Sequence, residues 1–277
     1  MVYKEKTLAI KNELKEMPNE LTAPRDQANK YNKHFVCIAS SVVDNNQSLN
    51  PDLSHIENFV NVRKPSTTNF EIPLLDVNSL DKLIESLPTN VATGPNGISA
   101  SLLKLISPAI LESIFKVLNC SIRCGICPSA LKLARVTPVP KPGAASDPNS
   151  SRPISVLPII SKPLERHIYI QLMLYLRRYN LIVSTRSGFR PRHSSESILI
   201  KMTDDWLAAM DQGFYTGAIF LDLRKAFHVV NHDLFIAKLE TYGCSSSTLP
   251  WLRSYPSDRR QCVELADAVS DTEVLYY

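Results

Sequence analysis

A short apolar segment that ends in one carboxylate places the strongest constraint on this chain. Residues 218–221 (AIFL) are β-prone and are followed directly by Asp222, and residues 231–233 (NHD) then open an expected helix. A strand that carries a carboxylate at its end holds a metal ligand on a rigid element. Aspartate also ends many strands as a turn or capping residue. On this segment alone, both interpretations of Asp222 stay open.

The length and composition are those of an ordinary globular protein. The chain has 277 residues, of which 44% are hydrophobic and 21% charged, enough for one large domain or two small ones. The net charge of +4 is compatible with nucleic-acid binding but does not identify it. No signal peptide and no apolar run of membrane-spanning length is visible. We therefore expect an intracellular protein without a membrane partner, whose six cysteines are free thiols.

Hydrophobic periodicity predicts an α+β fold with two parts. Residues 1–75 are expected to form a helical and loop-like N-terminal arm or linker, because residues 41–73 are rich in Asn, Ser and Pro. Residues 76–277 are expected to form the main domain. The expected helices are 11–20, 26–35, 77–87 (capped by Ser79), 100–122 (broken at Pro108), 160–179, 194–210, 234–242 and one near Leu249; the expected strands are 133–139, 152–157, 218–221, 261–266 and 273–277.

Two stretches carry cations where an anionic ligand could be held. The expected hairpin 135–157 has Lys141 on one side and Arg152 on the other, and two such cations can grip a polyphosphate. The segment 187–194 combines Gly188, Phe189 and Arg190 just before a helix start, which suits a nucleic-acid strand. A solvated surface loop and an ordinary helix-entry loop are the respective alternatives.

Two further patterns point to other chemistry. Cys120, Cys124 and Cys127 have the spacing with which radical S-adenosylmethionine enzymes hold an iron–sulfur cluster, but Cys120 ends an expected helix and no βα repeat surrounds it. Asp204 and Asp205 form a pair like that of a polymerase metal site, but their apolar neighbours recur at helical spacing. The sequence therefore favours small buried cysteines and a solvated helix face.

Taken in order, several stretches resemble the reverse transcriptase of non-LTR (LINE-type, jockey-like) retrotransposons. The resemblance covers roughly residues 75–277, and its strength lies in the order of the motifs. It implies a right-hand polymerase fold with fingers and a palm. The stretches are Thr93–Ile98, Gly125–Pro128 with Lys132, Val136–Lys141, Arg152–Ser155, Ser161–Arg166, Ser187–Arg190, Phe220–Phe227, Trp251–Tyr255 and Asp258–Val263.

The resemblance also implies an activity, an RNA-directed DNA polymerase that adds deoxynucleotides to a DNA primer on an RNA template with two Mg²⁺ ions. Asp222 matches the catalytic carboxylate that binds the metals, and the Leu223 carbonyl matches a main-chain metal ligand. Phe227 matches the steric gate that excludes a ribose 2′-hydroxyl.

The same resemblance gives the cationic stretches their expected partners. Lys141 and Arg152 match the residues that hold the incoming deoxynucleoside triphosphate. Gly188, Phe189 and Arg190 match the segment that contacts template or primer.

The chain also departs from the pattern of the family. His228 stands where a second aspartate is usual, and Pro256 replaces a leucine and would interrupt a helix. The chain ends before the Pro-Gln-Gly and Tyr-x-Asp-Asp motifs, and one aspartate cannot hold two Mg²⁺ ions. We therefore expect a truncated fragment, comprising fingers and the first part of the palm, that is catalytically silent alone. A non-catalytic nucleic-acid-binding remnant and, more remotely, an iron–sulfur enzyme are the alternatives.

Overall fold

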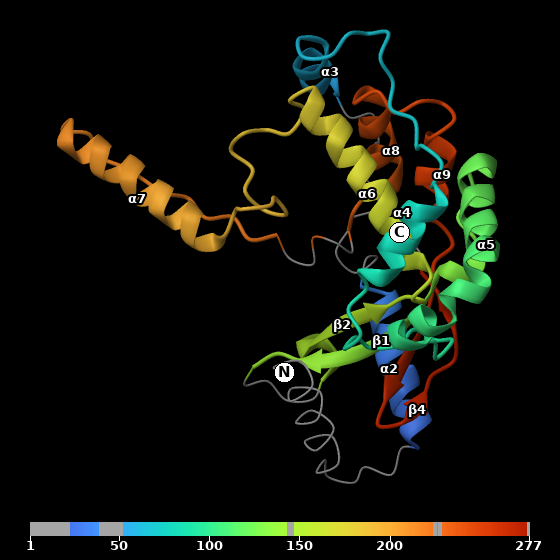
Figure 1. The fold of residues 1–277 in the computed structure, drawn as a ribbon. Helices are drawn as coiled ribbons and strands as arrows, with labels where there is room; N and C mark the ends of the chain where they lie inside the picture. Colours follow the sequence, from blue (N-terminus) through green and yellow to red (C-terminus); the bar gives the residue numbers. More distant parts are fainter. Residues whose placement is uncertain (1–22, 39–51, 143–146, 224–225, 227–228, 276–277) are drawn as a thin grey trace.

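The computed structural model describes residues 23–38, 52–142, 147–223, 226 and 229–275, and these form an α+β structure around a mixed sheet (Figure 1). The expected α+β class is confirmed. The expected helix 11–20 lies outside the described residues. No helix in the described ranges is long and apolar enough to cross a membrane.

The sheet has the strand order β2-β1-β3-β4, and β5 also pairs with β3. As the sequence predicts, β1 (Leu133–Pro140) and β2 (Ser151–Val156) form an antiparallel hairpin. The later strand β3 (Arg260–Leu265) runs parallel to β1, and β4 (Ala268–Val269) and β5 (Glu273–Val274) pair antiparallel to it. The expected pairing of the two last strands is thereby confirmed.

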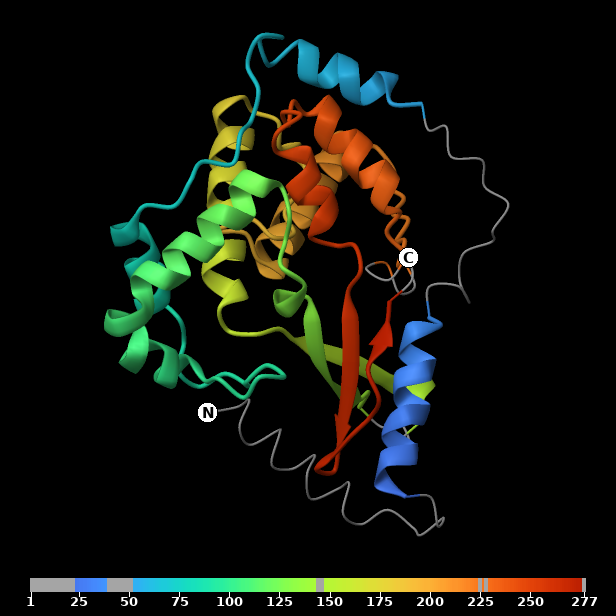
Figure 2. The same cartoon turned by 90° about the vertical axis from the view of Figure 1, so that its right-hand side faces the viewer.

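Helix α2 (Pro24–Val36) lies along the sheet (Figure 2). Its buried residues Ala28, Tyr31 and Phe35 recur at helical spacing and pack in one cluster with Val136 and Val263 of the sheet. The apolar face of α2 therefore covers strands that come about 100 residues or more later in the chain.

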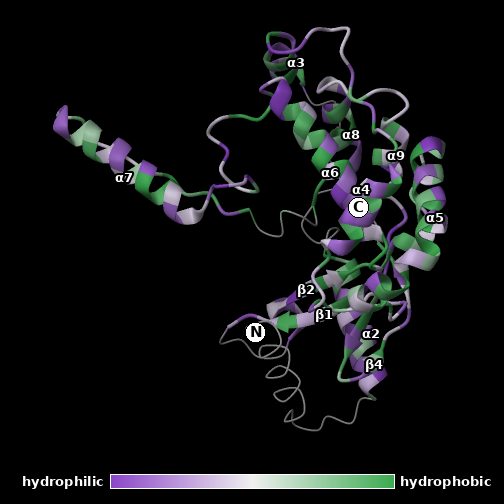
Figure 3. Ribbon diagram, viewed as in Figure 1, coloured by the Kyte–Doolittle hydropathy of each residue, from purple (hydrophilic) through white to green (hydrophobic). Residues whose placement is uncertain are grey.

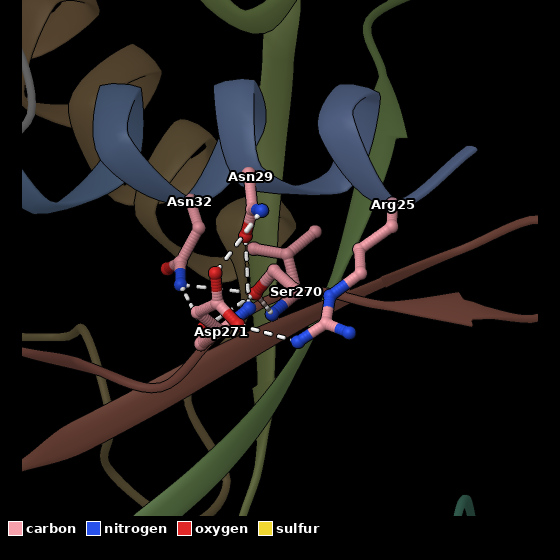
Figure 4. A network of polar contacts seen from close by, with 6 residues as sticks. Arg25, Asn29, Asn32, Ser270 and Asp271 are labelled. Atoms are coloured by element: carbon pink, nitrogen blue, oxygen red, sulfur yellow. Dashed lines mark hydrogen bonds and ion pairs between the residues drawn. The ribbon is translucent and has the colours of Figure 1, made fainter. Parts of the chain in front are cut away.

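Polar contacts hold the same helix to the segment after β4 (Figure 4). The amide of Asn32 is buried and donates to the Ser270 hydroxyl (3.0 Å) and the Asp271 carbonyl (2.8 Å), and its oxygen accepts from the side chain of Gln261 (2.9 Å). At the rim, Arg25 pairs with the Asp271 carboxylate at 2.6 Å. This ion pair is exposed, so the buried amide is the part of the network that matters most for stability.

The remaining elements form a helical body with its own core. The helices are α3 (Ser54–Asn61), α4 (Val77–Glu85), α5 (Ala100–Cys124), α6 (Ser161–Arg178), α8 (His232–Thr241) and α9 (Leu249–Ser254), with short 3₁₀ turns η1 (Ser129–Leu131) and η2 (Pro148–Ser150). The fully buried side chains of this core include Leu80, Ile84, Leu103, Leu118 and Leu164, which come from helices α4, α5 and α6, and Val60 of α3.

Three details of the helices differ from the sequence predictions. Helix α3 lies within the Asn- and Pro-rich stretch that was expected to be a linker. The N-cap of α4 is Asp76, whose carboxylate accepts from the backbone N–H of Ser79 (2.8 Å). Helix α5 runs unbroken through Pro108. The Ser107 hydroxyl donates to the Lys104 carbonyl (3.0 Å), which lacks its usual N–H partner because residue 108 is proline.

The predicted strand 218–221 is wrong. Residues 214–223 have no regular secondary structure, and Ile219, Phe220 and Leu221 are each more than 75% exposed. They follow helix α7 (Ser195–Asp211), which projects from the body and buries none of its residues (Figure 1). Figure 3 shows apolar and polar positions alternating along α7 in the open. A strand requires a hydrogen-bonding partner, and the described residues supply none here.

Candidate nucleotide and nucleic-acid interface

The β1–β2 hairpin brings the two predicted phosphate-binding cations to one face. Arg152 lies directly opposite Val139 in the strand register, and Lys141 follows Val139 by two residues. The backbone N–H of Lys141 donates to the Ser150 carbonyl (2.9 Å), which extends the ladder to this position. Directly opposed residues, and residues two apart, share a face of a sheet. Both cations are exposed, so the face is open to an anionic ligand.

The turn at residues 93–97 is fixed against this hairpin. The Arg135 guanidinium donates to the Thr93 hydroxyl (2.6 Å) and pairs with Glu264 at 3.3 Å. Gly94 lies so close to the chain that a Cβ there would be 2.7 Å from the Leu157 carbonyl oxygen. A glycine is therefore required for the turn to approach the end of β2.

Several residues of the motifs that carry the resemblance meet in a structural cluster at the start of β1. The buried Lys132 ammonium donates to the Ser254 hydroxyl (3.3 Å), and the Tyr255 hydroxyl donates to the Glu165 carboxylate (3.0 Å). The Arg259 guanidinium lies over the Tyr255 ring at 4.3 Å. Burial raises the pKa of Tyr255 to about 12. These motif residues join α6, α9 and the start of β1, which is a structural role.

The structure does not complete the predicted metal site. Asp222 and Leu223 are exposed on the irregular segment, and Phe227 lies outside the described residues. Among the residues with described positions, no group of three or more His, Cys, Asp or Glu could hold a metal ion. Asp222 therefore offers a single carboxylate, which does not fit the demand of Mg²⁺ for six near-octahedral ligands.

The segment after α6 forms a loop that presents a ring and a cation. The Arg190 Nη1 donates to the carbonyls of Ser184 (3.2 Å) and Arg186 (2.9 Å), which fixes its guanidinium. Phe189 is 77% exposed and has a positive φ of 59°. A Cβ added at Gly188 would meet no atom within 4 Å, so neither crowding nor a left-handed backbone requires glycine there.

This loop and the end of α6 enclose a half-open pocket of about 460 Å³. Its walls carry Arg190, Arg192 and His193 of the segment 187–194, and also Arg177, a cation that the sequence did not predict to lie here. The remaining lining residues are Leu176, Asn180, Ile182 and Pro191. The two adjacent arginines at 177 and 178 were the sequence feature that could have indicated this site. The spacing of residues in the sequence does not predict the turn that brings Arg177 to the same pocket as Arg192.

Helices hold two of the three cysteines and both aspartates, whereas Cys127 lies beyond the end of α5. The expected burial of the cysteines is wrong for Cys120 and Cys124, which are exposed on α5 with their sulfurs 3.8 Å apart. It is confirmed for Cys127, whose burial raises its pKa. Asp204 and Asp205 lie exposed on α7. The expected helical placement of both carboxylates is confirmed.

Residues 139–269 match the family described as reverse transcriptase (RNA-dependent DNA polymerase). A probable RNA-directed DNA polymerase from transposon BS of Drosophila melanogaster is 28% identical over 226 residues, which cover 79% of this chain and 24% of that protein. A probable RNA-directed DNA polymerase from transposon X-element of the same species is 32% identical over 187 residues, covering 65% and 20%. The RNA-directed DNA polymerase from mobile element jockey of Drosophila funebris is 27% identical over 166 residues, covering 60% and 18%.

The matched region includes both hairpin cations, the basic pocket and Asp222. The chain spans between about a fifth and a quarter of the length of these relatives.

Proposed function

Because the chain is related in sequence to the reverse transcriptases of jockey-like mobile elements, we propose that it is part of an RNA-directed DNA polymerase with a right-hand fold. Residues 76–277 would supply the fingers and the first part of the palm, and residues 1–75 an N-terminal arm. The partners are an RNA template, a DNA primer and deoxynucleoside triphosphates. The observation that carries this proposal is the common exposed face of Lys141 and Arg152 within the matched region.

The contribution of the chain's own residues is to bind and orient the nucleotide. Lys141 supplies a compact charge and Arg152 a planar fork, a combination that suits a triphosphate. Asp222 and the Leu223 carbonyl are the proposed magnesium ligands, and Phe227 is the proposed steric gate. Since the described residues do not complete a two-ion site, these three assignments rest on the sequence resemblance alone.

Binding of a labelled deoxynucleoside triphosphate tests the proposal. Lys141→Ala and Arg152→Ala should each weaken binding about tenfold, because each removes a charge-assisted hydrogen bond worth about 1.4 kcal/mol or more. Arg123→Ala, which removes an exposed cation of α5, is the matched control and should leave the affinity unchanged. Equal affinities in all three variants would remove the hairpin from the proposed function.

A second candidate is a nucleic-acid-binding protein without polymerase chemistry, favoured by the lone exposed Asp222. Primer extension with an RNA template, a DNA primer and Mg²⁺ separates the two. We expect no incorporation by this chain alone, because the described residues do not complete a metal site. Incorporation that is lost in Asp222→Ala and kept in Asp205→Ala would contradict this expectation and establish the polymerase.

A further inference from the structure

We propose that the exposed cysteines Cys120 and Cys124 of α5 form half of a four-thiolate site for Zn²⁺. The same pair of a second copy of this chain completes the site. It uses no residue of the hairpin, the basic pocket or the segment around Asp222, so it does not depend on the proposed function. Its support is the distance between the two sulfurs, their exposure, and the exposed apolar side chains beside them.

The two thiols lie on one face of α5, close to its C-terminal end. Residues four apart on a helix project from the same side in consecutive turns, as Cys120 and Cys124 do. Both side chains are exposed, and their sulfurs are 3.8 Å apart. Helix α5 lies at the outer edge of the helical body (Figure 1). A second molecule can therefore reach both sulfurs at once.

The distance between the sulfurs matches one edge of a zinc–thiolate tetrahedron. Two sulfurs that each lie about 2.3 Å from one Zn²⁺, at a tetrahedral angle, are about 3.8 Å apart. A disulfide requires sulfurs about 2.05 Å apart and Cβ atoms about 3.5–4.5 Å apart. Cβ atoms at this helical spacing are about 5–6 Å apart, so a disulfide would require the end of α5 to unwind. The folded pair therefore suits a bridging ion better than a bond between its sulfurs.

Metal binding replaces protons that the pair holds when no ion is bound. The two thiols are hydrogen-bonded to each other, and this bond, together with the charge of Cys120, raises the pKa of Cys124. Zn²⁺ binds the thiolate form, so each chain releases two protons to the solvent and no electron is transferred. Four thiolates around one Zn²⁺ leave a net charge of −2. Arg123, the exposed basic residue of the last turn of α5, offsets one of these charges in each chain.

One chain supplies only two of the four ligands that Zn²⁺ takes in structural sites. Cys127, the third cysteine of the spacing, is buried, and no group of three or more His, Cys, Asp or Glu in the described part of the chain could hold a metal ion. A second copy brings an identical pair, and a two-fold axis through the ion places four sulfurs around it. The site is therefore complete only between two chains.

Exposed apolar side chains on both sides of the thiols suit a contact between two chains. Val117, one turn before Cys120, is 54% exposed, and Ile126, just beyond the end of α5, is 59% exposed. A two-fold contact centred on the thiols would cover these side chains in both copies, which removes apolar surface from water. Soft thiolate ligands also favour Zn²⁺ over Mg²⁺, which prefers oxygen.

Zinc titration of the full chain, kept reduced with a phosphine, tests the site. We expect about half an ion per chain and a dimer that forms with zinc and is reversed by EDTA, as metal analysis and light scattering measure. Cys120→Ser and Cys124→Ser should each abolish the dimer, because two thiolates per pair of chains do not complete the tetrahedron. Cys37→Ser is the matched control, because Cys37 is an exposed cysteine at the end of α2, and it should change neither readout.

Two further measurements separate the ligands from the contact around them. Cd²⁺ in place of zinc gives an ultraviolet thiolate-to-metal band, whose intensity per ion should correspond to four thiolates in the unaltered chain. Val117→Asp keeps both thiols and should weaken the zinc-dependent dimer, because it places a carboxylate where the second chain approaches. These side chains are exposed, so the variants should fold, and circular dichroism checks that they do.

Four results would overturn the proposal. One ion per chain without dimerisation would show that the ion is not shared. Zinc binding that is unchanged in both Cys120→Ser and Cys124→Ser would place the ion elsewhere. A dimer that persists in EDTA would remove the metal as the link, and a dimer that appears only without reductant would be a disulfide.

Discussion

At the scale of residues, two glycines from the motifs that carry the resemblance differ in the space around them. A methyl group at Gly94 would meet backbone atoms of Leu157 and Pro158 at 2.7–2.8 Å, whereas a methyl group at Gly188 would meet nothing within 4 Å. Both glycines lie in motifs of the sequence, but the sequence does not predict which of them is crowded by its neighbours. The difference depends on the end of β2, which comes roughly 60 residues after Gly94.

Gly94→Ala should therefore lower the free energy of unfolding by about 1–3 kcal/mol, because the crowding atoms belong to backbone and cannot rotate away. Gly188→Ala should change it by less than about 0.5 kcal/mol. Urea denaturation followed by circular dichroism measures both. A stable Gly94→Ala protein would show that the 93–97 turn is not held against the hairpin.

Tyr255 makes stability depend on alkaline pH. Its folded pKa of about 12 exceeds the ordinary value of 10.0, mainly because of burial. Between these values the folded state retains a proton that the unfolded state releases, so this group's stabilisation is present below pH 10 and is lost as pH rises toward 12. The expected slope is about 1.4 kcal/mol per pH unit.

Urea denaturation at about pH 9, 10 and 11 should show a shallower decline in Tyr255→Phe than in the unaltered chain. The pKa of Tyr175 is also raised to about 12, so part of the decline in the free energy of unfolding remains in Tyr255→Phe as in the unaltered chain. Tyr215 is fully exposed, so Tyr215→Phe should follow the unaltered chain. An unchanged slope in Tyr255→Phe would contradict the assignment.

At the scale of elements, local pattern predicted the structure where a partner was near. The hairpin was predicted because both strands and the loop between them are close neighbours in the sequence, and this also placed Lys141 and Arg152 correctly on one unit. The prediction of a strand at 218–221 was wrong. The segment is apolar and β-prone, but the described residues supply no strand that pairs with it. The pocket was half predicted, since Arg190 was named and Arg177 was not.

Helix α7 is the element that the fold supports least. It buries none of its residues, and an isolated helix of 17 residues is marginal in water. In a hydrogen–deuterium exchange experiment, the backbone amides of α7 should therefore exchange within seconds. The amides of α5 near Leu118, which is fully buried, should stay protected far longer. Protection of α7 equal to that of α5 would show that another surface covers it in solution.

At the scale of the whole molecule, long-range contacts hold the sheet together. Strand β3 joins β1 in parallel, and α2 packs across both, so neither pairing could be read from neighbouring sequence. The buried amide of Asn32 links these parts with three hydrogen bonds.

Asn32→Ala should lower the free energy of unfolding by about 2–3 kcal/mol, because it leaves the buried Gln261 amide unsatisfied. Asn29→Ala, which removes bonds at the exposed rim, should cost less than about 1 kcal/mol. Thermal or urea unfolding compares the two. Equal costs would show that α2 is held by its rim and not by its buried contacts.

The packing of α2 against the late strands also implies a delay during synthesis of the chain. Asn32 and its partner Ser270 are 238 residues apart, and a ribosome adding about 5–20 residues per second needs roughly 10–50 s to make the second after the first. A helix forms in about a microsecond. The apolar residues Ala28, Tyr31 and Phe35 therefore lack the cover of β3 until the end of that interval. That interval is when a chaperone would meet this protein, and slowing translation would lengthen it.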